Sequence, residues 1–262
     1  MPLGSPNPSR RPHDWLPCRT NAPATPVEIP RRCRSALAAE PSRRHDQRMN
    51  IPLWLLVAAV GASAAILAYL RFFRPWQLRW GATAEEVSRP LPGDEVVPDP
   101  TFDATRAITI AARPEQIWPW LRQVGVKRAG WYSYDLLDNL ARPSAREIIP
   151  ELQQLAVGDV VPLSPDGKQG VHVLALDLPR SMMWGTLPDT TWLWVCEPRA
   201  DGTTRLITRI RSHYRWLSPS IAFSLLTEFA DVWMIRKMLL NLRERAETLA
   251  RADTAGSLHQ PL

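Results

Sequence analysis

Few side chains in this sequence are suited to acid–base chemistry, and they are scattered. His172 alternates with Leu174 and Leu176 in a strand-like segment, where it is either a general base in a pocket or an ordinary half-buried histidine. Asp135 and Asp138 are one helical turn apart, which suits either paired carboxylates or acids that stabilise the N-terminal end of a helix. The sequence has no GxSxG, P-loop, HExxH or CxxC motif, and no GxGxxG after a strand. We therefore predict no catalytic residue and leave enzymatic activity open.

Cysteine and histidine spacing predicts neither a disulfide framework nor a metal site. The cysteines are Cys18, Cys33 and Cys196, and the histidines are His13, His45, His172, His213 and His259. None of them shows the spacing of metal ligands. We expect Cys196, which stands alone in the regular part of the chain, to be a small buried apolar residue. No metal and no cofactor is predicted.

A basic strand near the C-terminal third looks at first like an anion site. Alternation over 204–214 places Leu206, Thr208, Ile210, Ser212 and Tyr214 on one face, and Arg205, Arg209, Arg211, His213 and Arg215 on the other. Because the apolar face must turn toward a core or cavity, we expect the arginines on the solvated convex face of a sheet. Thr208, Ser212 and Tyr214 are then the better candidates for hydrogen bonds to a ligand.

The elements that would position these residues begin at about Thr105. The pattern predicts a strand over 106–110, a helix from Pro114 to Gly125, a short helix over 132–140 with Leu136, Leu137 and Leu140 as its apolar face, strands over 159–163, 170–178, 191–197 and 204–214, and a helix from Ser218 to about Ala250. Short turns join the later strands, which makes the sheet antiparallel and the fold class α+β. A curved antiparallel sheet wrapped around the long C-terminal helix is the compact arrangement that these elements allow.

The N-terminal part divides into a tail, an anchor and a linker. Residues 1–48 hold nine Pro and nine Arg and are expected to be disordered, or untranslated if synthesis starts at Met49. Residues 51–70 carry no charge and are long enough to cross a bilayer, so 49–74 is predicted to be a transmembrane anchor; a signal peptide cleaved near Ala64 and a buried core helix are the alternatives. Residues 75–104, with five Pro, form a linker that either separates the membrane from the domain or lies along the domain surface. The domain is expected over 105–251, followed by a polar tail at 252–262.

The charge distribution bears on both partners and topology. Residues 1–50 carry a formal charge of +5 (nine Arg, four acids) and residues 51–262 one of +1 (23 basic, 22 acidic side chains), so the domain has no overall basic character and nucleic acid is not an expected partner. With a start at Met49, positive charge flanks the anchor on its C-terminal side only, which predicts a cytoplasmic domain. With the whole tail present, six Arg in 31–50 face four in 71–90, and the bias reverses.

Three segments resemble the START-like helix-grip superfamily, also known as SRPBCC, the polyketide cyclase/dehydrase and lipid-transport type. They are ITIAARPEQIWPWLRQVG at Ile108–Gly125, GWYSYDLLDNL at Gly130–Leu140 and AVGDVVPL at Ala156–Leu163. WGATAEEVSRPLPGDEVVPDP at Trp80–Pro100 resembles the lead-in of membrane-anchored bacterial members. The resemblance implies an apolar cavity between the sheet and the C-terminal helix.

The aromatic stretch Pro114–Leu140 would then form one wall of that cavity, unless its rings simply fill the core. The predicted cavity residues are Trp118, Leu121, Trp131, Tyr132, Tyr134, Thr208, Ser212, Tyr214, Leu226, Phe229 and Trp233. The favoured hypothesis is a single-pass cell-membrane protein that binds a hydrophobic small molecule or a lipid. A polyketide cyclase or aromatase using His172, Tyr132 or Asp135, and a non-catalytic scaffold whose cavity is filled by its own side chains, are the alternatives.

Overall fold

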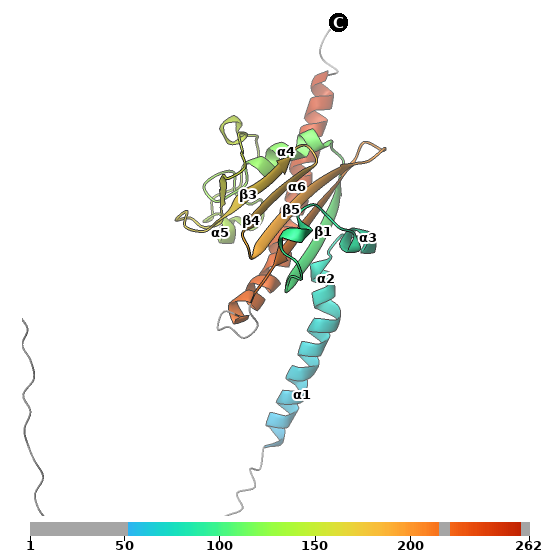
Figure 1. Ribbon diagram of the computed structural model, residues 1–262, viewed down its shortest axis with the longest axis vertical. Helices are drawn as coiled ribbons and strands as arrows, with labels where there is room; N and C mark the ends of the chain where they lie inside the picture. Colours follow the sequence, from blue (N-terminus) through green and yellow to red (C-terminus); the bar gives the residue numbers. More distant parts are fainter. Residues whose placement is uncertain (1–51, 215–220, 258–262) are drawn as a thin grey trace, which may run out of the picture. The chain divides into compact units, whose positions relative to one another are not determined.

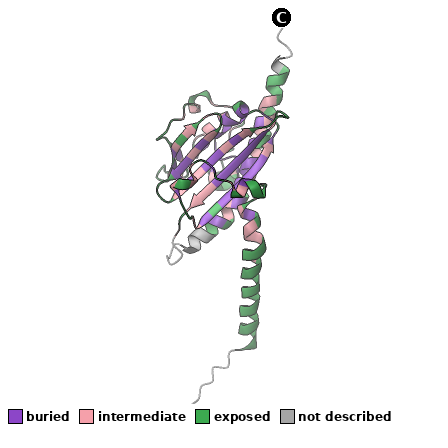
Figure 2. Cartoon of the chain, turned by 45° about the vertical axis from the view of Figure 1, so that its right-hand side comes forward, coloured by how far each residue is buried: buried purple, intermediate pink, exposed green. Residues whose placement is uncertain are grey.

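A computed structural model describes residues 52–214 and 221–257, so the predicted tail 1–48 lies outside the described residues. The described chain begins with a helix that runs through α1 (Leu53–Ala68), the π-helical turn η2 (Tyr69–Phe73) and α2 (Arg74–Leu78). This Leu53–Leu78 helix of 26 residues is long and apolar enough to cross a membrane, and its apolar window is not buried in the protein. Figure 2 shows α1 exposed along its length. The helix extends four residues beyond the predicted end at residue 74.

The domain is built on one antiparallel sheet, as predicted, but the sheet has six strands where five were predicted. The strands are β1 (Phe102–Ile110), β2 (Val160–Pro162), β3 (Gly170–Asp177), β4 (Ser181–Thr186), β5 (Thr190–Pro198) and β6 (Thr204–Ser212), in the spatial order β1-β6-β5-β4-β3-β2. All neighbouring strands are antiparallel. Strand β4 was not predicted, because methionines on both of its faces, Met182 inward and Met183 outward, hide the alternation.

The long helix α6 (Ile221–Ser257) lies across one face of this sheet (Figure 1). It runs seven residues past the predicted end at Ala250. Its buried side chains Leu239 and Leu242 join the main core cluster together with Trp184, Trp194 and Leu206 from the sheet. The predicted α+β helix-grip architecture, a sheet packed on a long C-terminal helix, is therefore confirmed.

Two short helices connect β1 to the rest of the sheet. Helix α4 (Pro114–Arg122) begins with Pro114, contains Pro119 and packs against α6. Helix α5 (Asp135–Asp138) is a single turn, shorter than the predicted 132–140. The prediction that Leu136, Leu137 and Leu140 form a buried face was wrong: they are 76%, 73% and 52% exposed. After one helical turn the backbone adopts positive φ at Leu140, so the segment cannot continue as an amphipathic helix.

Residues 81–97 cover the outer face of β1, β6 and β5 and are not an extended spacer between the N-terminal helix and the domain. The short helix α3 (Ala84–Ser88) forms where one helical turn was expected, and a capping box between Thr83 and Glu86 starts it. Leu91 packs with Ala107, Leu193 and Ile207 of the sheet in a second, smaller core cluster. The predicted linker therefore lies along the domain surface.

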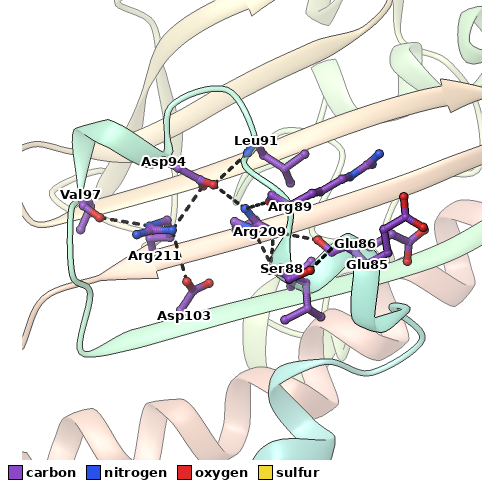
Figure 3. A network of polar contacts seen from close by, with 12 residues as sticks. Glu85, Glu86, Ser88, Arg89, Leu91, Asp94, Val97, Asp103, Arg209 and Arg211 are labelled. Atoms are coloured by element: carbon purple, nitrogen blue, oxygen red, sulfur yellow. Dashed lines mark hydrogen bonds and ion pairs between the residues drawn. The ribbon is translucent and has the colours of Figure 1, made fainter.

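The arginines of β6 attach this segment to the sheet (Figure 3). Arg205 donates to both carboxylate oxygens of Glu86, at 2.7 and 2.8 Å. Arg209 donates to Asp94 at 2.5 Å and to the backbone carbonyls of Glu86 and Val87. Arg211 also contacts Asp94, at 3.6 Å. Arg205 and Glu86 form a hydrogen-bonded ion pair. The hydrogen bonds from Arg205 stabilise the ionised carboxylate and lower the pKa of Glu86 below its usual range.

The prediction that these arginines are solvated is therefore wrong, although the face was assigned correctly. Arg205 is 9% exposed and Arg209 is 3% exposed. The physical reason is the covering segment 81–97, whose carboxylates and carbonyls replace the water that would otherwise surround guanidinium groups. The acidic residues of the linker therefore form ion pairs with the arginines of β6.

A candidate ligand cavity between the sheet and helix α6

A cavity of about 630 Å³ lies between the inner face of the sheet and the N-terminal half of α6. This volume falls within the roughly 300–1,000 Å³ typical of small-molecule sites. The walls are predominantly apolar and come from four regions: Trp131 before α5, Leu163 and Val171 around β2 and β3, Trp192 and Ile210 in β5 and β6, and Ala230, Met234, Ile235 and Met238 in α6. The structure therefore shows an open cavity, in contrast to the alternative of an interior filled by its own side chains.

Stacked tryptophans fix the shape of one wall. The rings of Trp131 and Trp192 are parallel within 8°, with centroids 5.7 Å apart. Trp184 meets both rings edge-on, at 6.2 and 5.3 Å. The indole N–H of Trp192 donates to Thr208 Oγ1 at 2.7 Å, which orients that ring. Rigid rings of this kind present a large apolar surface to a ligand at a small cost in conformational entropy.

Five polar residues, Ser133, Asp138, Thr190, Thr227 and Asp231, interrupt this apolar lining. Burial raises the pKa of Asp138 above its usual range, and the Ser133 hydroxyl partly offsets that effect. A few polar groups in an apolar cavity orient a ligand more than they hold it. This lining suits a largely apolar molecule that carries one or two hydrogen-bonding groups.

One of these polar residues, Asp231, is paired with a buried arginine on the inner face of the sheet, Arg106. Arg106 in β1 is 1% exposed and shares this face with Ile108 and Ile110. Its Nη1 lies 2.6 Å from Oδ2 of Asp231, and its Nε donates to the Gln77 carbonyl at 2.9 Å. Because a buried guanidinium needs an anionic or hydrogen-bonding partner, Arg106 links β1 and α2 to the cavity-lining Asp231 of α6.

A second cavity of about 350 Å³ shares Thr190, Ile210, Thr227 and Asp231 with the first. Phe102, Ser212, His213, Tyr214 and Glu228 complete its lining. Tyr214 donates its hydroxyl to Glu228 at 2.7 Å, and burial together with this carboxylate raises the pKa of Tyr214 to about 12. Polar groups are therefore more frequent here than in the larger cavity.

Glu228 connects this polar end to the N-terminal helix. The glutamate is 4% exposed although it lies on α6 between exposed residues. Arg74 donates to it through Nε at 2.7 Å, and Gln77 donates through Nε2 at 3.1 Å. The helix with the composition of a membrane anchor is thus joined to the cavity wall by a network of buried, charge-assisted hydrogen bonds.

The predicted site residues are distributed over the domain. Trp131 lines the larger cavity, and Ser212 and Tyr214 line the smaller one. Thr208 lies next to the tryptophan wall of the larger cavity, where its hydroxyl accepts the hydrogen bond from the Trp192 indole. These are the predicted residues that the structure brings together.

The other predicted aromatic and apolar residues lie outside both cavities. Trp118 and Leu121 are buried in the core on α4, and the Trp118 indole donates to the Pro179 carbonyl. Tyr132 is 1% exposed and donates its hydroxyl to the Trp120 carbonyl at 3.1 Å. Tyr134 is 37% exposed, with the Lys237 ammonium 4.1 Å from its ring centroid.

Three predicted residues of α6 take no part in the cavities because they lie on another side of the helix. Leu226, Phe229 and Trp233 are 63%, 45% and 39% exposed. The cavity is lined instead by positions 227, 230, 231, 234, 235 and 238 of α6. Since apolar residues occur on both sides of this helix, the sequence alone did not separate the face toward the sheet from the other one.

The residues considered for proton transfer also lie elsewhere. His172 is exposed on β3, and Asp135 accepts a hydrogen bond from the backbone N–H of Ser144 at 3.1 Å. Tyr132 is occupied by the core hydrogen bond described above. Among the described residues, no group of His, Cys, Asp and Glu is arranged to hold a metal ion. Cys196 is buried on the inner face, and burial raises the pKa of its thiol, as expected for a packed apolar residue.

Most of the lining of the larger cavity was not predicted, including Trp192, Met234, Met238 and Asp231, and neither was Arg106, the buried partner of Asp231. The signal for this pair was present: Arg106 occupies an inward position of an otherwise apolar strand, and Asp231 lies one turn before Ile235 on the inward face of α6. A charge at an inward position of a strand is uncommon, so it predicts a buried partner of opposite charge. Searching the inward face of the last helix for such a partner would have found Asp231.

No model of a known protein family matches this sequence, and no curated protein matches it. Solved structures do match. The Polyketide_cyc-like protein Cgl2372 from Corynebacterium glutamicum is 14% identical, over 61% of this chain and 97% of that one, with a TM-score of 0.37. The conserved protein of unknown function EF2215 from Enterococcus faecalis is 12% identical over 58% and 75% of the two chains, with a TM-score of 0.35. DynU16, a protein of the dynemicin biosynthetic locus, is 12% identical over 55% and 48%, with a TM-score of 0.32.

Proposed function

We propose that this chain is a membrane-anchored protein that binds a hydrophobic small molecule or a lipid in the cavity between its sheet and α6. The observation that carries the proposal is the cavity itself, with its wall of Trp131, Trp192, Met234 and Met238. Apolar surface buried against such a wall stabilises a complex by about 25 cal/mol per Å². The polar residues in the lining, Asp138 among them, supply hydrogen-bonding groups for a ligand that carries one or two polar atoms.

The Leu53–Leu78 helix supports the anchoring part of the proposal. Its apolar residues are exposed, for example Val60 at 70% and Leu67 at 66%, so the protein itself does not cover them. Arg71, Arg74 and Arg79 follow the apolar run, and we propose that the domain is cytoplasmic. Protease added to inverted membrane vesicles should then digest the domain. Protection of the domain would refute the proposed orientation.

A bulky side chain in the cavity provides the test of ligand binding. Met234 lines the cavity, and Met234→Trp would fill part of it with an indole ring. Arg243→Trp places the same ring at an exposed position further along α6 and serves as the matched control. The full chain is reconstituted in nanodiscs, and a fluorescent fatty-acyl probe is titrated into wild type and both variants.

The proposal predicts that probe fluorescence saturates with wild type. Met234→Trp should lower the affinity for the probe by tenfold or more, and Arg243→Trp should leave it unchanged. Comparing the variants removes the contribution of probe that partitions into the bilayer, because this contribution is equal in all three samples. Equal titration curves for the three chains would refute a ligand site in this cavity. Circular dichroism of the variants checks that the fold is kept.

A further inference from the structure

A strip of exposed apolar side chains continues from the anchor onto α6. It comprises Phe72 and Trp76 on the anchor helix and Leu226, Phe229 and Trp233 on α6, all between 39% and 70% exposed. We call these five residues the apolar strip. A contiguous exposed apolar surface on a folded domain usually marks an interaction site.

Ring contacts show that the two parts of the strip are continuous. Phe73 packs against Phe229 with centroids 5.7 Å apart, and Trp76 packs against Trp233 at 6.3 Å. Contacts advance along both helices together, so α2 and the start of α6 run side by side in the same direction. Both carboxylates within this stretch of α6 are paired, Glu228 with Arg74 and Asp231 with Arg106, so neither adds an unpaired charge to the strip.

The pairing also sets the height of α6 relative to the bilayer. The uncharged run ends at Leu70, and Arg74 is four residues further along the helix, which corresponds to about 6 Å. Glu228 lies beside Arg74, and Leu226 precedes it by two residues, or about 3 Å. The headgroup layer extends about 5–7 Å beyond the hydrocarbon core on each side. Leu226, about 3 Å beyond the end of the uncharged run, therefore falls within this layer when the anchor stands upright, and Phe229 lies at its outer edge.

We infer that the end of the apolar strip nearest the anchor, Phe72 and Leu226, is immersed in the interfacial layer of the bilayer, so that α6 is a second membrane-contacting element next to the anchor. The inference rests on the proposed anchoring of Leu53–Leu78, and its partner is the lipid surface. Trp76, about 9 Å beyond the end of the uncharged run, lies just outside this layer, near the interface that amphipathic indole rings prefer. Thr227 and Glu228, which line the smaller cavity, lie next to the strip, so the polar end of the cavity is at the level of the lipid headgroups.

A second group of exposed leucines makes a sharp comparison possible. Leu137 on α5 is 73% exposed, more than Leu226 at 63%. The neighbouring Tyr134 lies under Lys237, nine residues and hence about 13 Å beyond Glu228 along α6. Leu137 should therefore lie well outside the headgroup layer, although its side chain is equally apolar. Exposure alone predicts lipid contact at both leucines, whereas the geometry predicts it at Leu226 alone.

The test uses an environment-sensitive NBD label on single cysteines in the full chain. Cys18 and Cys33 are replaced by Ser, and the buried Cys196 is kept, with the unsubstituted parent as the labelling blank. Leu226→Cys and Leu137→Cys are compared in nanodiscs by emission maximum, quenching by doxyl lipids and quenching by aqueous iodide. Val60→Cys, in the middle of the apolar run, reports whether the anchor itself is inserted.

With the Val60 label in lipid, we expect the Leu226 label to emit at shorter wavelength, to be quenched by doxyl lipids and to be protected from iodide. The Leu137 label should behave in the opposite way. Iodide-accessible labels at both leucines would overturn the inference and leave the anchor intact, and lipid-like labels at both would show a domain that lies flat on the bilayer. A water-exposed Val60 label would instead refute the anchoring on which the inference depends, and the cavity titration remains independent of all these outcomes.

Discussion

Replacing Arg205 by Met should release the covering segment 81–97 from the sheet. The substitution keeps much of the aliphatic stem but removes both hydrogen bonds to Glu86, at 2.7 and 2.8 Å, and the bond to the Gly81 carbonyl. Glu86, 8% exposed, would then be a buried carboxylate without its cation. Breaking a buried ion pair from one side usually costs about 3–5 kcal/mol.

Protonation limits this cost. At pH 7, a carboxyl with an ordinary pKa of about 4.3 can be neutralised for roughly 4 kcal/mol, at about 1.4 kcal/mol per pH unit. The amide of Thr83 also continues to donate to Glu86, at 2.8 Å. We therefore expect a loss of about 2–4 kcal/mol of unfolding free energy, or roughly 4–16 °C in Tm for a domain of this size.

Tryptophan fluorescence during thermal unfolding in detergent micelles measures this loss. The matched control is Arg199→Met, which makes the same change at an exposed position after β5 and should shift the unfolding free energy by less than about 0.5 kcal/mol. Arg205 holds the pKa of Glu86 below its usual range, so the stability from this pair is present above the unfolded pKa of Glu86 and is lost as the pH falls through the folded one. The difference between wild type and Arg205→Met should therefore shrink below about pH 4. Equal Tm values for the two Met variants at pH 7 would refute a structural role for the Arg205–Glu86 pair.

Two further predictions concern local packing. Gly81→Ala should lower the unfolding free energy by about 3 kcal/mol or more, because the residue has a φ of +73° and a Cβ would overlap the Ala107 carbonyl. Gly167→Ala, at a similar φ of +71° with open space around it, should cost only about 1 kcal/mol. Equal Tm shifts for the two variants would contradict the close contact at Gly81. Cys196, 3% exposed with a pKa raised by burial, should resist iodoacetamide at pH 8 in the folded chain and react in denaturant, as followed by mass spectrometry of its peptide; rapid alkylation of the folded chain would show that the inner face of β5 is open.

The fold was predictable from the sequence to the extent that local pattern determines it. Period-two alternation located β1, β3, β5 and β6, and the long apolar periodicity located α6. Strand β4 escaped because its methionines leave no contrast between its faces. These successes and failures follow from the same rule, that a pattern is readable where one face is apolar and the other polar.

The candidate site was less predictable because it depends on which elements meet. Alternation assigned Arg209 to the correct face, but nothing in the strand indicated that a segment more than one hundred residues earlier would cover that face. The same applies to Glu228, whose partner Arg74 lies 154 residues away. Apolar residues on α6 could be recognised, but the side toward the sheet is set by the position of β5, β6 and the N-terminal helix. Contacts between distant segments therefore decide burial and cavity lining, and one sequence carries only indirect signals of them.

Native mass spectrometry of the full chain released from nanodiscs tests the central claim most directly. The account predicts that wild type carries a bound small molecule or lipid through gentle activation, that Arg243→Trp retains it, and that Met234→Trp loses it because an indole occupies its place between Trp192 and α6. A bare chain in all three samples, or the same adduct retained by Met234→Trp, would contradict a ligand-binding cavity between the sheet and the C-terminal helix.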